Sequence, residues 1–262
     1  MQILSRWIGM KATQETKKLY DESAGDWKRV EPILLSDYSA RPFVIDLCEP
    51  IVNKNILDLG CGEGYVGREL INRGAQYVHG IDISSQMIEQ ALIQKNEYQI
   101  TNASYETGDI RDFAVTESEQ YDLVLAMFLF NYLNVSETIS TMQKAYQLLQ
   151  FGGYFLFAVP HPSLPFLKKD KFPFYFKPEA GYFSGRDQLF PGEIWRRDRK
   201  AVAVQCVHKT MEDYFTSLRL AAFTKMPEVY ELKINQKHLE LDPEFFTPLI
   251  DLPLHVAFKI QK

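Results

Sequence analysis

Short apolar runs alternate with amphipathic stretches along the chain between about residues 40 and 160. In the amphipathic stretches, apolar residues recur every three or four positions, as on one face of a helix. The apolar runs have the length of buried strands and lie near 55–59, 78–83, 104–106, 121–126 and 154–159. This alternation predicts an α/β fold, a doubly wound and mainly parallel sheet with helices on both faces.

Two of the predicted helices have limits that the sequence suggests. One helix should span 39–51, directly before the first strand. Another should span 136–149, because Ile139, Met142, Tyr146 and Leu149 fall on one side of it. We expect this second helix to stop at Gly152 and Gly153, since glycine commonly ends helices.

Capping residues mark two further helices. Ser84 or Ser85 should begin the helix that follows the second strand. Thr210 and Asp213 have the spacing of a capping box and predict a helix that begins there. Two late apolar stretches, 228–234 and 255–260, should supply the last strands of the sheet.

The stretch 161–207 interrupts the alternation and is too long for an ordinary connection. It is crowded with aromatic residues, which a solvated linker would not carry. An insertion after the fifth strand falls at the carboxyl edge of the sheet, where open α/β sheets bind ligands. We therefore expect a lid over an apolar or aromatic ligand, with a small satellite core as the alternative. The predicted division is a helical cover (1–40), a core (41–160), the lid (161–207) and a return to the core (208–262).

Composition adds limits rather than a function. The chain has 262 residues, of which 46% are hydrophobic, so it can bury a full core. Its net charge of −5 gives it no general attraction for nucleic acid or anionic membranes. Three cysteines include no CxxC pair, so neither a metal site nor an oxidising compartment is supported. Residues 1–18 have no long apolar core and no segment could span a bilayer, so we expect a cytoplasmic protein.

The most informative motif follows the first predicted strand. Asp58 ends that strand, and three alternate glycines follow before a helix begins: Gly60, Gly62 and Gly64. Glycines there let the backbone pass close to a ligand near a helix N-terminus. A dinucleotide fingerprint needs a small residue where Tyr65 stands, and no Lys-Ser or Lys-Thr follows as in a P-loop. The carboxylate of Asp58 suits a ligand with a positive end.

The pattern D-x-G-x-G-x-G resembles motif I of the class I S-adenosylmethionine (SAM) dependent methyltransferases. The resemblance implies a seven-stranded sheet of order 3-2-1-4-5-7-6 and SAM as cofactor, with S-adenosylhomocysteine as product. It also implies an enzyme that transfers a methyl group. The residues expected to bind the cofactor are Tyr20, Asp58, Gly60, Cys61, Gly62, Gly64, Asp82, Ile83, Met87, Asp109, Ile110 and Met127.

Two further acids support this resemblance. Asp82 ends the second predicted strand at a spacing from the glycines at which an acid meets ribose hydroxyls, as it does in the family. Gly108-Asp109-Ile110 matches the next motif of the family, in which Asp109 would accept the adenine amino group and Ile110 would cover the ring. Either acid alone could simply cap a helix. Together with the glycine motif they describe one adenosyl pocket.

Three residues are candidates for the methyl transfer itself. Methyl transfer needs an aligned nucleophile, exclusion of water and in some cases a base. His161 follows the fifth strand, and His208 begins a segment that resembles one recurring in small-molecule methyltransferases. Either could act as a base or simply hydrogen-bond the backbone. Tyr20 lies in a segment that resembles one in which a tyrosine comes near the sulfonium, where an aromatic face favours a cation.

Several classes of partner remain open from the sequence. We expect a small, partly aromatic or apolar acceptor methylated on oxygen or nitrogen, and a monomer or homodimer. The run 196–200 holds four basic residues and keeps an RNA methyltransferase as one alternative, and a non-catalytic SAM-binding regulator as another. A DNA substrate is not expected, because the motifs of DNA amino and C5 methylation are absent after the fourth strand.

Overall fold

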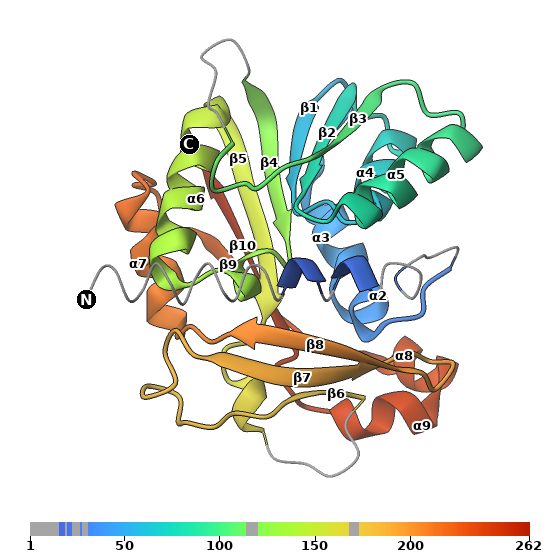
Figure 1. The fold of residues 1–262 in the computed structure, drawn as a ribbon, viewed down its shortest axis with the longest axis vertical. Helices are drawn as coiled ribbons and strands as arrows, with labels where there is room; N and C mark the ends of the chain where they lie inside the picture. Colours follow the sequence, from blue (N-terminus) through green and yellow to red (C-terminus); the bar gives the residue numbers. More distant parts are fainter. Residues whose placement is uncertain (1–15, 19, 23–26, 28–30, 114–119, 168–172) are drawn as a thin grey trace.

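The structure is a computed structural model that describes residues 16–18, 20–22, 27, 31–113, 120–167 and 173–262. Its central feature is a seven-stranded sheet of order β3-β2-β1-β4-β5-β10-β9 (Figure 1). The strands are β1 (Asn55–Leu59), β2 (Tyr77–Asp82), β3 (Ala103–Thr107), β4 (Tyr121–Met127), β5 (Leu149–Pro160), β9 (Glu228–Leu232) and β10 (His255–Gln261). Strands β1 to β5 are parallel, and β10 is antiparallel to both β5 and β9.

This sheet confirms the predicted fold class. Numbered along the chain within the sheet alone, the strands follow the expected order 3-2-1-4-5-7-6. The labels differ from those numbers because three strands of a second sheet, β6 to β8, come between β5 and β9 in the chain. The antiparallel end formed by the last two strands is the one that the resemblance implied.

Helices cover both faces of the central sheet. They are α3 (Arg41–Leu47), α4 (Tyr65–Asn72) and α5 (Ser85–Glu97) on one face, and α6 (Val135–Leu148) and α7 (Met211–Leu220) on the other. Successive strand residues point to opposite faces. Leu57 of β1 packs in the cluster that holds Met142 and Leu218, whereas Ile56 packs in the cluster that holds Val44 and Leu70. Alternate side chains of β1 thus pack into two separate hydrophobic cores.

The helical segment before the sheet begins and ends earlier than predicted and is interrupted. The expected helix over 39–51 is replaced by two short helices, α2 (Leu35–Ser39) and α3, with a break at Ala40. Pro42 lies in the first turn of α3. Proline lacks an N–H group and its ring would clash with the preceding turn, so a continuous helix through this point is disfavoured.

The predicted end of the helix over 136–149 was also wrong in detail. Helix α6 ends at Leu148, and its C-cap Leu149 already has extended backbone angles. Leu149 is fully buried and starts β5, so packing of this leucine ends the helix before the glycines. Gly152 instead adopts a positive φ of 81° inside the long strand β5. The caps at Ser84 and at Thr210 with Asp213 are confirmed.

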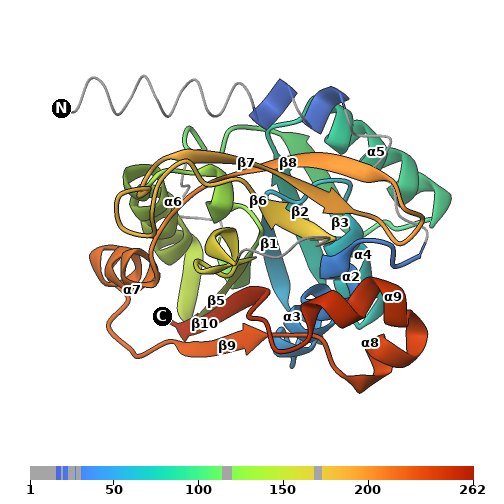
Figure 2. The ribbon, with the colours of Figure 1, turned by 90° about the horizontal axis from the view of Figure 1, so that it is seen from below.

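The aromatic insertion forms a second, three-stranded antiparallel sheet. Its strands are β6 (Phe174–Phe176), β7 (Leu189–Trp195) and β8 (Ala201–Val207). Figure 2 shows this sheet lying across the ends of the central strands. Its buried side chains share one hydrophobic cluster with α9 (Pro243–Phe246) and the short turn Thr247–Leu249 through Phe245, Phe246 and Leu249. Leu239 of α8 (Gln236–Leu241) packs against this cluster. The insertion therefore packs with part of the C-terminal segment rather than by itself.

Candidate functional site

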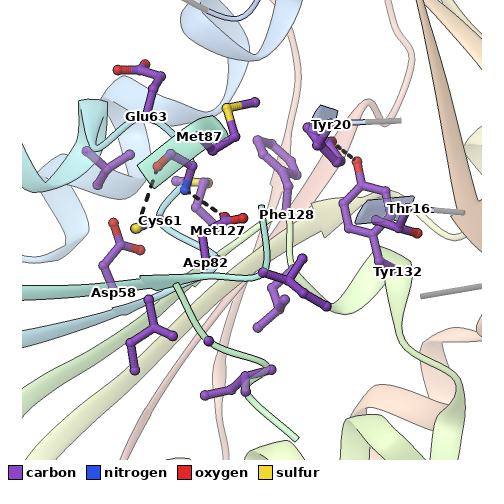
Figure 3. A pocket seen from close by; sticks show the side chains of 18 of the residues that line it. Thr16, Tyr20, Asp58, Cys61, Glu63, Asp82, Met87, Met127, Phe128 and Tyr132 are labelled. Atoms are coloured by element: carbon purple, nitrogen blue, oxygen red, sulfur yellow. Dashed lines mark hydrogen bonds between the residues drawn. The ribbon is translucent and has the colours of Figure 1, made fainter. Parts of the chain in front are cut away.

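A cavity lies at the carboxyl ends of β1 to β4, where the strand order reverses around β1. It measures about 1060 Å³ including its opening to solvent. Open α/β sheets bind ligands at this kind of crevice. Predicted cofactor residues on its wall are Tyr20, Asp58, Gly60, Cys61, Gly62, Asp82, Ile83, Met87, Asp109, Ile110 and Met127 (Figure 3). Gly64 alone among the predicted cofactor residues does not line it.

The glycine loop between β1 and α4 has a backbone that favours glycine at each of its three positions. Gly60, Gly62 and Gly64 have φ values of 72°, 55° and 78°. A Cβ added at Gly62 would meet no described atom within 4 Å, which leaves the backbone open to a ligand. A Cβ at Gly64 would lie 2.9 Å from the ring of Tyr105. Gly64 therefore makes room for the core, and Gly62 makes room for a ligand.

Asp58 is the least satisfied polar group of the cavity wall. Its side chain is 1% exposed, and neither carboxylate oxygen has a hydrogen-bond partner among the described residues. Burial and the nearby charge of Asp82 raise the pKa of Asp58 to about 7, against a smaller opposing effect of Arg41. A buried carboxylate without a partner is costly, and a cation bound beside it would relieve that cost. The site fits the ammonium group of an amino-acid ligand.

Asp82 connects the second strand to the glycine loop. Its Oδ2 accepts a hydrogen bond from the Gly62 N–H at 2.9 Å (Figure 3). Its Oδ1 accepts one from the Ser84 N–H at 2.9 Å. Burial raises the pKa of Asp82 above its usual value, while these backbone hydrogen bonds act in the opposite direction. Each carboxylate oxygen can accept a second hydrogen bond. Asp82 can therefore hold the loop and still receive ligand hydroxyl groups.

Asp109 and Ile110 form the part of the wall that follows β3. The guanidinium of Arg111 lies beside Asp109 and, against the opposing effect of burial, lowers the pKa of that carboxyl group. Arg111 also lines the cavity, although the sequence did not single it out. Ile110 is 7% exposed and offers an apolar surface next to these charges. A flat, partly polar ring fits this combination.

Another part of the wall is aromatic. Tyr20, Trp27, Phe128 and Tyr132 line it, and the ring centroid of Tyr20 lies 5.3 Å from that of Trp27 and 5.5 Å from that of Tyr132. The hydroxyl groups of Tyr20 and Tyr132 are hydrogen-bonded to each other (Figure 3). Burial, more than the neighbouring phenol, raises the pKa of Tyr20 well above its usual value, so this phenol stays protonated.

Arg41 is a cavity residue that the sequence reasoning missed. It is 8% exposed, donates to Asp37 Oδ1 at 2.8 Å, and has its guanidinium 5.2 Å from the centre of the Phe128 ring. A cation in the first turn of a helix opposes the helix dipole, so an arginine at the start of α3 was a signal of some other role. Its charge on the wall suits a ligand carboxylate.

Neither candidate histidine belongs to the described cavity wall. His161 has Nδ1 2.7 Å from Ser163 Oγ and Nε2 3.0 Å from Glu231. His208 has Nε2 2.8 Å from the Tyr182 carbonyl oxygen, and burial lowers the pKa of both imidazoles. These contacts match the structural alternative for each residue. A catalytic role for either histidine stays a prediction that this geometry does not support.

No group of three or more metal-binding side chains gathers in the described part of the chain. Within the same residues, no helix has the length and apolar character that a bilayer span requires.

Comparisons with known proteins agree with this site. Residues 56–153 match the family described as a methyltransferase domain. The ubiquinone biosynthesis O-methyltransferase of Neisseria meningitidis is 26% identical over 190 residues, which cover 70% of this chain and 76% of that protein. The aklanonic acid methyltransferase of a Streptomyces strain is 26% identical over 167 residues, covering 61% of this chain and 73% of that protein.

A solved structure shares the fold. The SAM-dependent methyltransferase from Mesorhizobium loti superposes with a TM-score of 0.65 at 21% identity, covering 84% of this chain and 96% of that one. The matched family domain runs from β1 into β5 and contains the glycine loop, Asp58, Asp82 and Asp109. The unpartnered Asp58 and the open backbone at Gly62 fit the ligand of that family. Residues 56–153 therefore form a methyltransferase domain, and the family match, the relatives and the shared fold together support a class I SAM-dependent methyltransferase with SAM as its cofactor.

Proposed function

We propose that this enzyme methylates an oxygen or nitrogen atom of a small, partly aromatic or apolar metabolite. The observation that carries the proposal is the aromatic part of the cavity wall, formed by Tyr20, Trp27, Phe128 and Tyr132. Aromatic rings offer large apolar contact area together with a face that attracts cations. The two relatives described above act, by their names, on small molecules, which supports the same class here.

The proposed roles follow the order of groups along the cavity. When bound, SAM would supply a methyl group activated by its sulfonium, and S-adenosylhomocysteine would be the leaving group. Asp58 would pair with the ammonium, Arg41 with the carboxylate, and Asp82 with the ribose hydroxyls. Tyr20, with its protonated phenol held by Tyr132, would contact the reacting end and help exclude water.

Phe128, in the aromatic part of the cavity wall, has an unusual backbone conformation. It has a φ of 59°, which is uncommon for a bulky side chain and costs free energy. Its N–H donates to the Ala158 carbonyl oxygen at 2.8 Å, which holds the turn in place. Strained residues of this kind cluster at binding sites, in keeping with a role in shaping the acceptor end.

The insertion is proposed to act on the site indirectly. None of its described residues, 161–167 and 173–207, lines the cavity. However, Gln205 of β8 donates to Thr16 Oγ1 at 2.8 Å, and Thr16 does line it. A lid role would then consist of supporting the N-terminal residues that cover the cavity.

An RNA substrate finds less support. In the basic run 196–200, Arg196 pairs with Asp198, while Arg197 and Arg199 pair with Asp242. Arginines paired with acids in this way present less free positive charge to a phosphate backbone. The three cysteines are free and buried, which is consistent with the proposed cytoplasmic setting.

Methyl transfer itself is the test. The protein, supplied with methyl-labelled SAM, is incubated with panels of small phenols, amines and carboxylic acids, and label in the acceptor is counted together with S-adenosylhomocysteine formed. Transfer to at least one panel member, lost in Asp82→Ala, is expected. Cofactor binding without transfer to any member, but with transfer to bulk tRNA or rRNA, would replace the proposal with the RNA alternative.

A further inference from the structure

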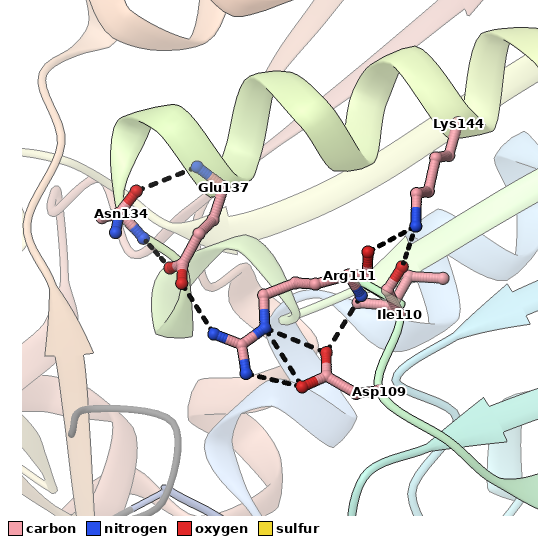
Figure 4. A network of polar contacts seen from close by, with 6 residues as sticks. All are labelled: Asp109, Ile110, Arg111, Asn134, Glu137 and Lys144. Carbon is pink, nitrogen blue, oxygen red and sulfur yellow. Dashed lines mark hydrogen bonds and ion pairs between the residues drawn. The ribbon is translucent and has the colours of Figure 1, made fainter. Parts of the chain in front are cut away.

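Arg111 lies between two carboxylates on the wall that follows β3 (Figure 4). Its Nη2 donates to Asp109 Oδ2 at 2.5 Å, and its Nη1 donates to Glu137 Oε1 at 2.7 Å. Its Nε lies 2.9 Å from Asp109 Oδ1 and 3.1 Å from Oδ2. The backbone N–H of Arg111 also donates to Asp109 Oδ1 at 2.9 Å. Three N–H groups of one residue thus hold a single carboxylate.

These contacts leave Asp109 with little free capacity. A carboxylate offers about four acceptor positions. The N–H, Nε and Nη2 groups of Arg111 use about three of them, so about one remains for a ligand. The side chain of Asp109 is 22% exposed and lines the cavity, so a ligand can reach it.

The surrounding loop is fastened as well. Lys144 Nζ donates to the carbonyl oxygens of Ile110, Arg111 and Phe113. Glu137 is itself held in a capping box, because its Oε2 accepts from the Asn134 N–H at 3.0 Å. Arg111 is therefore anchored to the first turn of α6 and cannot turn away from Asp109 without breaking an ion pair.

The position of Asp109 indicates which part of the cofactor it meets. Asp58 and Asp82 lie on β1 and β2, and Asp109 follows β3, in the same order across the sheet. Neighbouring strands are about 4.8 Å apart, so the three acids span roughly 10 Å. If the ammonium of SAM lies at Asp58, as proposed above, the ribose and then the adenine come toward Asp109. The inference below rests on that proposed placement.

We propose that Arg111 is a positioning residue that makes the cofactor pocket selective for a purine with a 6-amino group. It keeps the Asp109 carboxylate as a hydrogen-bond acceptor with about one acceptor position left for a ligand. That position suits a single N–H of the 6-amino group. A 6-oxo purine has a carbonyl oxygen at that position, which is itself a hydrogen-bond acceptor. This oxygen and the Asp109 carboxylate would then face each other without a hydrogen bond. Arg111 also lowers the pKa of Asp109, so this carboxyl group does not gain the proton with which it could donate.

The test compares two product analogues that differ only at this atom. Calorimetry gives the dissociation constants of S-adenosylhomocysteine and of its deaminated form, S-inosylhomocysteine, for the intact protein and its variants. The intact protein should prefer the amino form by roughly 10- to 100-fold, the value of a charge-assisted hydrogen bond. Arg111→Met and Arg111→Lys should both reduce the preference to within about threefold, because neither side chain provides the planar fork. Asp109→Asn, whose amide can donate, should reduce or reverse it.

Lys144→Met is the matched control, since it loosens the same loop without touching Asp109. It should weaken binding of both analogues alike and keep their ratio. A ratio unchanged in both Arg111 variants, or unchanged in Asp109→Asn, would overturn the inference. A ratio that falls equally in Lys144→Met would show that only loop order matters and would also overturn it. If the intact protein binds neither analogue, the proposed placement of SAM itself fails, which is a separate result.

Discussion

Replacing Asp58 by Asn should stabilise the ligand-free protein while it weakens cofactor binding. The pKa of Asp58 rises from 3.8 to about 7 on folding, mainly through burial. At about 1.36 kcal/mol per pKa unit, holding this carboxylate ionised in the folded protein costs about 4 kcal/mol at pH 8. The amide of Asn would itself lack partners at a cost of about 1 to 3 kcal/mol. A net gain of roughly 1 to 3 kcal/mol at pH 8 is therefore expected.

The difference in stability between the wild type and Asp58→Asn should depend on pH. Because the folded pKa of Asp58 lies above the unfolded one, the folded state binds the extra proton between about pH 4 and pH 7. The stability of the wild-type protein relative to the Asn variant therefore falls as the pH rises through that window. The advantage of the variant should grow by roughly 2 to 3 kcal/mol between pH 5 and pH 8.

Two measurements check the prediction. Urea unfolding of both proteins without ligand, at pH 5 and pH 8, gives the difference in free energy of unfolding at each pH. Calorimetric titration at pH 8 gives the affinity for SAM, which should fall by roughly 10-fold or more because the ammonium loses a charged partner. The reasoning is refuted by a stability difference that does not change with pH, or by a variant that binds SAM as tightly as the wild type.

Three further variants test the packing around the cavity. Gly80→Ala should lower the free energy of unfolding by about 1 to 3 kcal/mol, because a Cβ there lies 2.6 Å from the Tyr105 ring. Adding Tyr105→Leu to this variant should recover part of the lost stability, as measured by urea titration. Tyr132→Phe should cost about 1 kcal/mol through the lost hydrogen bond to Tyr20, and a double-mutant cycle with Tyr20→Phe should show coupling of similar size. Lys209→Met should flatten the pH dependence of the free energy of unfolding. Burial lowers the pKa of Lys209 to about 8, so the folded wild-type protein loses this proton at a lower pH than the unfolded chain does. The stability of the wild type relative to the variant should therefore rise from pH 8 to pH 10.

Each of these has an outcome that would contradict it. A Gly80→Ala protein as stable as wild type would mean that the ring of Tyr105 does not fill that space. Additive losses in the tyrosine cycle would show that the two phenols do not interact. Parallel pH profiles for the Lys209 variant and the wild type would show that Lys209 is not titrating in the folded protein.

The sequence predicted the core and its acids because both depend on short-range patterns. Parallel strands end at one edge of a sheet, so an acid that ends a strand must reach the ligand crevice. That rule applies to Asp58 and Asp82, whereas Asp109 came from the resemblance to the family, and all three line the cavity. The cap at Ser84 was also local, since its side chain accepts a hydrogen bond from the Met87 N–H, only three residues further along the chain.

What the sequence could not predict depends on contacts between distant segments. Arg41 reaches the cavity through tertiary packing of α3, and no periodic pattern marks it. Likewise, the aromatic wall joins Tyr20 and Trp27 to Tyr132, more than a hundred residues away in the chain. His208 stays a prediction, since its motif resemblance suggested chemistry while its imidazole packs on Phe190 with ring centroids 5.5 Å apart.

The central claim is that this cavity binds SAM through the acids at the strand ends. Calorimetric titration of the intact protein, and of Asp82→Ala, with SAM and with S-adenosylhomocysteine tests it most directly. The account predicts binding in the micromolar range by the intact protein and at least roughly tenfold weaker binding by the variant, which has lost a ribose acceptor and the partner of the Gly62 N–H. No binding by the folded, ligand-free wild-type protein, or equal binding by the two proteins, would contradict it.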